Sequence, residues 1–183
     1  VSTKHLDRFG DLAPRVQQEI DDIVTDYKDY LIYQALKCET PIEQLVYLRF
    51  MELYFDEFTF FVMNDSNAYF NIYPQKEIEA NGKKYRVDFA IEIKFRGRTS
   101  LFAIECDGHE FHEKTKEQAL RDKKRDRDLM SVGYYVMRFT GSEIWNDPEG
   151  VVIEIYDLIK RLSGLEDYVD YQIRKSMENE AEE

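Results

Sequence analysis

Three acidic residues in the middle of the chain lie on sequence that alternates like a β-strand. Tyr85–Ile93 alternates apolar with polar residues, and Asp88 falls on the face opposite the apolar row. Leu101–Asp107 alternates in the same way and places Glu105 and Asp107 together on one face. The three carboxylates therefore belong to two predicted neighbouring strands.

The connection between these strands decides which acids meet. The intervening sequence predicts a hairpin turn, and we centre it between Gly97 and Arg98. This register sets Asp88 opposite Asp107, with Glu105 on the diagonal. We therefore expect three carboxylates to converge on one patch.

Such a patch has a predictable chemistry. Two carboxylates about 4 Å apart repel by roughly 4 kcal/mol at an effective dielectric constant of about 20, so the cluster should either shift a pKa or hold a cation. Mg²⁺ or Mn²⁺ is the natural occupant of an all-oxygen site, and such an ion activates water for phosphodiester hydrolysis. The alternative is that these acids keep an edge strand soluble or form salt bridges.

Composition sets limits on the fold and its partners. The 183 residues, 43% of them hydrophobic, suit one folded domain with a single core. The net charge of -12 excludes a protein that coats nucleic acid without specificity, because such binding depends on Lys and Arg. Cys38 and Cys106 are far apart and predict neither a zinc site nor a disulfide framework. With no run of 18 apolar residues and no signal-peptide or lipidation motif, we expect a soluble, cytoplasmic protein that enters no membrane.

The surrounding elements follow from periodicity and capping signals. Thr40-Pro41 with Glu43 three residues after Thr40 is a capping-box signature, and Asn81-Gly82 is a strong hairpin signal. The predicted order is an amphipathic helix to about Leu36, a largely buried helix Pro41–Phe60, strands Tyr69–Glu79, Lys83–Ile93 and Leu101–Asp107, a polar helix Lys114–Ser131, a strand Tyr134–Phe139 parallel to Leu101–Asp107, a turn region Gly141–Asp147, a helix Pro148–Leu162 and an acidic tail.

These motifs, in this order, resemble the PD-(D/E)XK nuclease superfamily, in particular its very-short-patch-repair-endonuclease-like branch. The resemblance covers roughly Thr40 to Ile159. Its carriers are Thr40-Pro41-Ile42-Glu43, Gln75, Arg86-Val87-Asp88-Phe89, Ile104-Glu105-Cys106-Asp107-Gly108, His112, Asp122, Arg125-Asp126, Leu129, Gly133-Tyr134, Val136-Met137-Arg138-Phe139 and Glu143-Ile144.

The resemblance implies an α/β, restriction-endonuclease-like αβββαβ core with a central mixed β-sheet flanked by helices. It makes Asp88 the first metal-binding aspartate and Glu105 the acidic residue of the (D/E)XK element. Asp107 is expected as a further metal ligand from the predicted convergence of the three carboxylates, and not from the resemblance. The standard motif has lysine where this chain has Asp107, so another group must supply that cation. His112 is the first candidate for it, as a proton shuttle or phosphate ligand.

Further residues at the edge of the site are implied by the same resemblance. Glu43 could bind a second ion or orient a water, and Gln75 could steady the metal shell. Arg125 and Arg138 either contact phosphate or hold the acidic cluster by ion pairing, and the ion-pairing role suits Arg138 better because it lies within a strand. The alternatives to His112 as the cationic or phosphate-binding group are His109, Lys114, Lys116 and Lys124.

The sequence therefore predicts a Mg²⁺- or Mn²⁺-dependent DNA endonuclease that hydrolyses phosphodiester bonds. We expect one domain over residues 1–183, with a helical extension at 1–37, a nuclease-like core at 40–162 and an acidic tail at 163–183. DNA is the expected partner, with a homodimer or a larger protein assembly left open. Two alternatives remain, a catalytically inactive nucleic-acid-binding or regulatory module on a nuclease scaffold and a protein-interaction domain.

Overall fold

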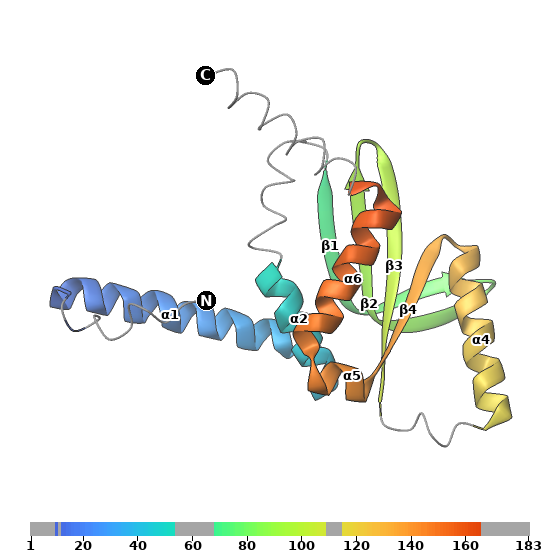
Figure 1. Cartoon of the computed structure of the whole chain (residues 1–183), viewed down its shortest axis with the longest axis horizontal. Coiled ribbons are helices and arrows are strands. Elements are labelled where there is room, and N and C mark those ends of the chain that lie inside the picture. The colour runs from blue at the N-terminus through green and yellow to red at the C-terminus, as the bar shows by residue number, and fades with distance from the viewer. Residues whose placement is uncertain (1–9, 11, 54–67, 109–114, 166–183) are drawn as a thin grey trace.

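The computed structural model of the chain describes residues 10, 12–53, 68–108 and 115–165 (Figure 1). It has a four-stranded mixed sheet flanked by helices, which confirms the predicted αβββαβ order and fold class. The elements are α1 (Pro14–Ala35), α2 (Pro41–Leu53), β1 (Tyr69–Ala80), β2 (Lys83–Phe95), β3 (Arg98–Asp107), α4 (Lys116–Ser131), β4 (Tyr134–Thr140), α5 (Gly141–Asn146) and α6 (Pro148–Ser163).

The sheet follows chain order, β1-β2-β3-β4. The β1–β2 and β2–β3 pairs are antiparallel, while β3 and β4 are parallel, as predicted, because α4 connects them and carries the chain back. The predicted turn region 141–147 contains the short helix α5 instead. This helix begins because the Thr140 hydroxyl accepts a hydrogen bond from the Glu143 amide and the Glu143 carboxylate accepts one from the Thr140 amide.

The turn between β2 and β3 differs from the sequence prediction by one residue. Phe95 pairs with Arg98, so the two-residue loop is Arg96-Gly97, with φ of 48° and 76°. Positive φ at both central residues is typical of the type I′ hairpin turn, in which glycine is favoured at the second position. A turn centred between Gly97 and Arg98 would instead have placed Gly97 at the first central position, as in a type II′ turn.

The shift in the turn changes which acids face one another. Phe89 pairs with Ile104, and this register, continued by one residue, sets Asp88 opposite Glu105. The prediction that Asp88 lies opposite Asp107 is therefore wrong. Asp88 and Glu105 remain on directly neighbouring strands.

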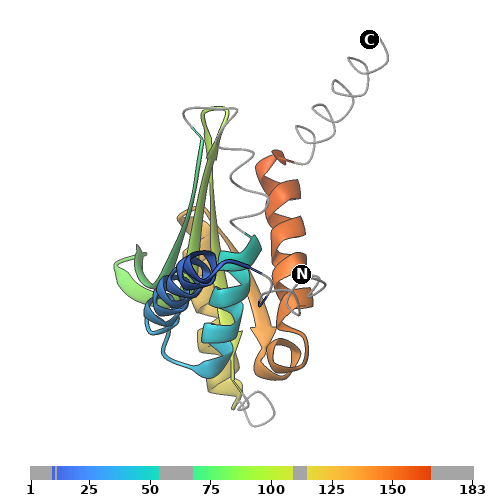
Figure 2. The ribbon, with the colours of Figure 1, turned by 90° about the vertical axis from the view of Figure 1, so that its left-hand side faces the viewer.

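Two hydrophobic cores lie on the two faces of the sheet (Figures 1 and 2). The larger core joins α2, α5 and α6 to the sheet and includes the fully buried Phe89 and Phe102. The smaller core lies under α4 and includes Val87 and Leu129. Apolar residues of α2 point toward the sheet and α6, which agrees with the predicted buried helix, although its predicted end at Phe60 lies outside the described residues.

The β1–β2 hairpin bends at the level of the acidic residues. Pairing along the described β1–β2 ladder skips Gln75 and Asp88, and Gln75 has a φ of 53°. Val87 packs under α4 whereas Phe89 packs in the opposite core, so the regular alternation of the strand breaks at Asp88. The turn end of the hairpin lies beside α4 (Figure 1), and the side-chain Nδ2 of Asn81 donates a hydrogen bond to Asp128 Oδ1 there.

Helix α1 projects from the body of the protein, and Figure 2 looks nearly along it. The predicted amphipathic helix is present, but much of its apolar face is in water, with Ile23 60% and Val24 58% exposed. Near its end Gln34 is buried against α2. No described helix has the length and apolar character needed to cross a membrane, and the cytoplasmic location stays a prediction.

Candidate active site

Asp88 lies at the bend of β2, between its neighbours β1 and β3. Its Oδ2 accepts a hydrogen bond of 2.6 Å from the backbone N–H of Cys106 on β3. Burial raises the pKa of Asp88 to about 6, and the nearby carboxylates of Glu43 and Asp107 add to the rise, while the Cys106 amide and Arg125 oppose it. The Asp88 carboxylate is therefore held in place, but the positive charge around it does not offset the cost of burying its ionised form.

Glu105 is a buried acid of the site, with 5% of its side chain exposed. Burial raises its pKa to about 8, and Asp88 and Asp107 raise it further, against the lowering effect of Arg125 and Arg138. The Arg125 Nη2 atom on α4 lies 2.6 Å from Glu105 Oε1. Among the described residues this Oε1 atom has no partner with hydrogen-bond geometry, so the contact is a close but poorly directed ion pair.

Asp107 forms an ion pair with Arg138. Its two oxygens accept hydrogen bonds of 3.2 and 3.3 Å from Arg138 Nη1, and Arg138 also binds Asp126 with an Nη2–Oδ1 distance of 2.7 Å. Within the described ranges, no three Asp, Glu, His or Cys side chains are arranged to hold a metal ion. The expected convergence of three carboxylates is therefore not found there, because the register moves Asp107 out of line with Asp88 and Arg138 binds it.

Glu43 and Gln75 join α2 to β1 beside the acids. Glu43 is 4% exposed, and its Oε2 accepts hydrogen bonds from Gln75 Nε2 at 2.7 Å and from the Glu39 amide at 2.9 Å. Its Oε1 accepts one of 2.7 Å from the Thr40 hydroxyl. The capping role predicted for Glu43 is present in modified form. A capping box would have its carboxylate accept from the backbone N–H of Thr40, whereas here it accepts from the backbone N–H of Glu39. The same carboxylate reaches the site through Gln75.

The remaining predicted residues are spread over α4 and the segment before it. Lys116 is exposed in the first turn of α4. Lys124 binds the buried Asp128, with an Nζ–Oδ2 distance of 2.8 Å, which assigns it a structural contact at the hairpin end. His109, His112 and Lys114 lie outside the described residues, and their roles stay predictions.

Two contacts of the site were not anticipated from the sequence. Asp126 is the second acid bound by Arg138, and the backbone carbonyl of Arg86 accepts a hydrogen bond from Arg125 Nη2. Asp126 could have been suspected, because it lies one residue after Arg125 on a helix that must pack against β4. A backbone acceptor such as the Arg86 carbonyl leaves no signal in a sequence.

The donor set of this site fits a hard divalent cation. Mg²⁺ is usually bound by one or two carboxylates together with waters and substrate phosphates, so it does not require a cage of protein ligands. Asp88 and Glu105 supply two such carboxylates on adjacent strands. Within the part of the chain that the structure describes, the buried Oε1 of Glu105 accepts no hydrogen bond, and this favours a cation there, since a buried carboxylate oxygen without a hydrogen bond is costly.

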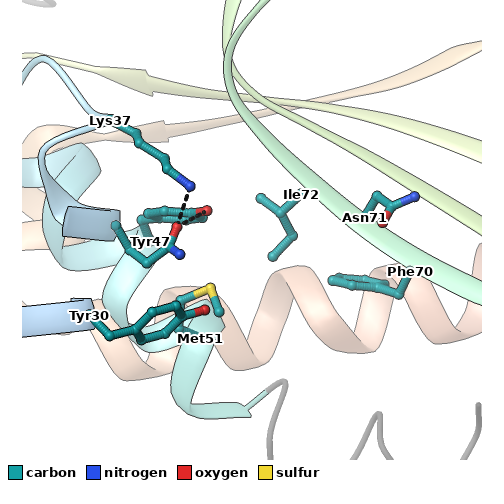
Figure 3. Close-up of a pocket in the computed structure, with 8 residues that line it drawn as sticks. Tyr30, Lys37, Tyr47, Met51, Phe70, Asn71 and Ile72 are labelled. Atoms are coloured by element: carbon teal, nitrogen blue, oxygen red, sulfur yellow. Dashed lines mark hydrogen bonds between the residues drawn. The ribbon is translucent and has the colours of Figure 1, made fainter. Parts of the chain in front are cut away.

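A separate pocket of about 270 Å³ lies between α1, α2 and β1 (Figure 3). The Tyr47 hydroxyl and Lys37 Nζ both donate to Gln34 Oε1 on its wall, and Tyr30 and Met51 face Ile72 across the opening. None of the predicted site residues lines this pocket. The acidic site and the pocket are therefore distinct features.

Part of the chain matches a known family model. Residues 70–159 match the family model described as REase_MTES_1575, which indicates a restriction-endonuclease-like family. The matched stretch runs from β1 into α6 and includes Asp88, Glu105, Arg125 and Arg138. The more specific likeness to the very-short-patch-repair branch stays a prediction.

An uncharacterized protein of Haemophilus influenzae (strain ATCC 51907 / DSM 11121 / KW20 / Rd) is 36% identical over 72 residues. The aligned region covers 39% of this chain and 53% of the relative, so the chain spans about half the length of that protein. No solved structure matched the chain.

Proposed function

We propose that this chain is a divalent-metal-dependent nuclease that hydrolyses phosphodiester bonds in DNA. The match to a restriction-endonuclease-like family supports nuclease activity and a DNA substrate. The observation that carries the metal dependence is the pair Asp88 and Glu105, two poorly compensated carboxylates on adjacent strands. These two residues would hold Mg²⁺ or Mn²⁺.

When bound, the ion supplies Lewis-acid stabilisation of the phosphoryl oxygen and lowers the pKa of a bound water. The chain orients this site through contacts that are already present. The backbone N–H of Cys106 fixes the Asp88 carboxylate by a hydrogen bond. Gln75 on β1 donates a hydrogen bond to Glu43 and so links α2 to β1. Arg138 keeps Asp107 in an ion pair, and in this proposal Asp107 acts by shaping the field around Glu105 instead of by binding the first ion.

Plasmid cleavage with Mg²⁺ or Mn²⁺ tests this proposal. Asp88→Ala and Glu105→Ala should each abolish cutting, because each removes one of two cation ligands. Glu154→Ala, an exposed acid on α6, is the matched control and should cut like the parent chain. Equal cutting by the two site variants would refute the assignment.

His112 is the proposed proton shuttle or phosphate ligand, as the resemblance implies. His112→Ala should therefore slow cleavage while Mn²⁺ binding, measured by calorimetry, is retained. An unchanged cleavage rate would assign that role to another group. Lys116 on the first turn of α4 is the next residue to substitute.

The exposed apolar face of α1 favours a second candidate, a protein-interaction domain. Ile23 and Val24 are more than half exposed on a helix that projects from the sheet. The overall charge of -12 also disfavours nucleic acid as the main partner. Failure to bind DNA at low salt, together with self-association lost on Ile23→Ser, would support this candidate over the nuclease.

A further inference from the structure

The two arginines at the acidic site hold their carboxylates in different ways. Arg138 forms hydrogen bonds to Asp126 and Asp107 with all three guanidinium nitrogens, at distances from 2.7 to 3.4 Å. Such a network satisfies both acids and fixes the guanidinium. Arg138 is therefore a permanent part of the fold.

Arg125 makes a less complete set of contacts. Its Nη2 lies 2.6 Å from Glu105 Oε1, yet in the described part of the chain neither that oxygen nor the Arg125 Nε has a hydrogen-bond partner. The Arg125 side chain is 25% exposed, so its guanidinium reaches the surface, whereas Glu105 is 5% exposed. The ion pair thus supplies charge to Glu105 with little directional bonding.

We propose that Arg125 is an exchangeable counter-cation, which partly compensates the charge of Glu105 in the metal-free site and turns to the substrate phosphate when a divalent cation binds Glu105. This inference rests on the proposed nuclease function and names a substrate-contacting residue for it. It also supplies a cation within reach of the site. The standard motif has a lysine two residues after the acid, and this chain has Asp107 there.

The physical reason for the exchange is charge repulsion. A guanidinium and a divalent ion on one carboxylate would lie about 4 Å apart, where even two single like charges repel by roughly 4 kcal/mol at an effective dielectric constant of about 20. In the ion-paired position, the Nη2 atom that contacts Glu105 also donates a hydrogen bond to the Arg86 carbonyl. A guanidinium there has the fork geometry that binds a phosphate through two hydrogen bonds.

Metal binding gives the first test. In calorimetry with Mn²⁺ alone, Arg125→Gln should bind the ion as tightly as the parent chain or up to about tenfold more tightly, because the competing charge is gone. Arg127→Gln, an exposed neighbour on α4, should leave the affinity unchanged. A fixed structural clamp predicts the reverse, and Mn²⁺ binding weakened at least threefold in Arg125→Gln, with a lowered melting temperature, would overturn the proposal.

DNA binding gives the second test. With Ca²⁺ present and the duplex checked for cleavage, Arg125→Gln should reduce the slope of log K against log salt by about one, the value for one lost phosphate contact. Arg125→Lys should keep most of that slope. An unchanged slope in Arg125→Gln would overturn the phosphate contact. Since neither readout is cleavage, an inactive protein and a wrong assignment of Arg125 give different results.

Discussion

Glu105→Gln should stabilise the metal-free protein at high pH. Burial raises the pKa of Glu105 from its ordinary value of 4.5 to about 8, even with Arg125 beside it. At about 1.36 kcal/mol per pKa unit, this rise corresponds to a cost on the order of 4 to 5 kcal/mol once the carboxyl is ionised. Glutamine has the same shape without the charge, but it loses the attraction of Arg125, so we expect a net gain of about 2 to 4 kcal/mol at pH 9.

The dependence on pH has a definite sign. Because the folded-state pKa of Glu105 is raised, the parent protein keeps its full stability below pH 4.5 and loses stability as the pH rises through about 8. Glu105→Gln should therefore match the parent near pH 4 and exceed it increasingly above that. The loss seen in the parent above pH 4.5 should be largely absent from the variant, with Asp88, whose pKa is raised to about 6, accounting for what remains.

Urea unfolding in EDTA across pH 4 to 9 measures this effect. At pH 9 the unfolding midpoint of Glu105→Gln should lie about 1 M above that of the parent, for a slope of about 2 to 3 kcal/mol per M. Added Mn²⁺ should raise the parent midpoint and leave that of the variant almost unchanged. A variant that unfolds at the same or lower urea concentration than the parent at pH 9 would refute the reasoning that Glu105 is an uncompensated buried charge.

Three further substitutions test contacts that position the site. Glu43→Ala should lower the free energy of unfolding by about 1 to 3 kcal/mol in urea titrations, because it leaves Gln75 and the start of α2 without their acceptor; an unchanged midpoint would show that these bonds add nothing. Gly97→Ala should cost about 1 to 2 kcal/mol by the same measurement, since its φ is 76°, and equal stability would contradict the assigned turn. Arg138→Gln should lower the melting temperature in calorimetry by roughly 4 to 10 °C because it removes the ion pairs of Arg138 with Asp107 and Asp126, and no shift would mean that water can replace these ion pairs.

The overall fold could be predicted because its signals are local and repeated. Period-two alternation identifies β2 and β3 directly, and the capping signals at Thr40 and the turn signal at Asn81 set where elements begin and reverse. A helix between β3 and β4 implies that the two strands run parallel. These features depend on a few residues each, so no knowledge of long-range packing was required.

The register of the site could not be obtained in this way. The turn sequence Arg96-Gly97-Arg98 accepts either of two centres, and a shift of one residue exchanges Asp107 for Glu105 as the partner of Asp88. Glycine suits the second central position of a type I′ turn and also the first central position of a type II′ turn, so the turn residues alone do not decide between the two centres.

Partners of charged side chains and the exposure of α1 depend on tertiary structure. The periodicity of α1 indicates an apolar face but not what covers it, and Ile23 remains 60% exposed. Similarly, Arg125 and Arg138 are both candidates for ion pairing or phosphate contact, and only their contacts in the folded chain distinguish the loose pair of Arg125 from the fixed network of Arg138. Such distinctions require the positions of neighbouring strands.

The central claim is that Asp88 and Glu105 together bind one divalent cation. Crystals of the protein soaked in Mn²⁺, with anomalous diffraction data collected, test it most directly. The account predicts a single strong anomalous peak between the two carboxylates, with Arg125 moved away from Glu105. Crystals that contain no peak there, with Glu105 still paired to Arg125 at saturating Mn²⁺, would contradict it.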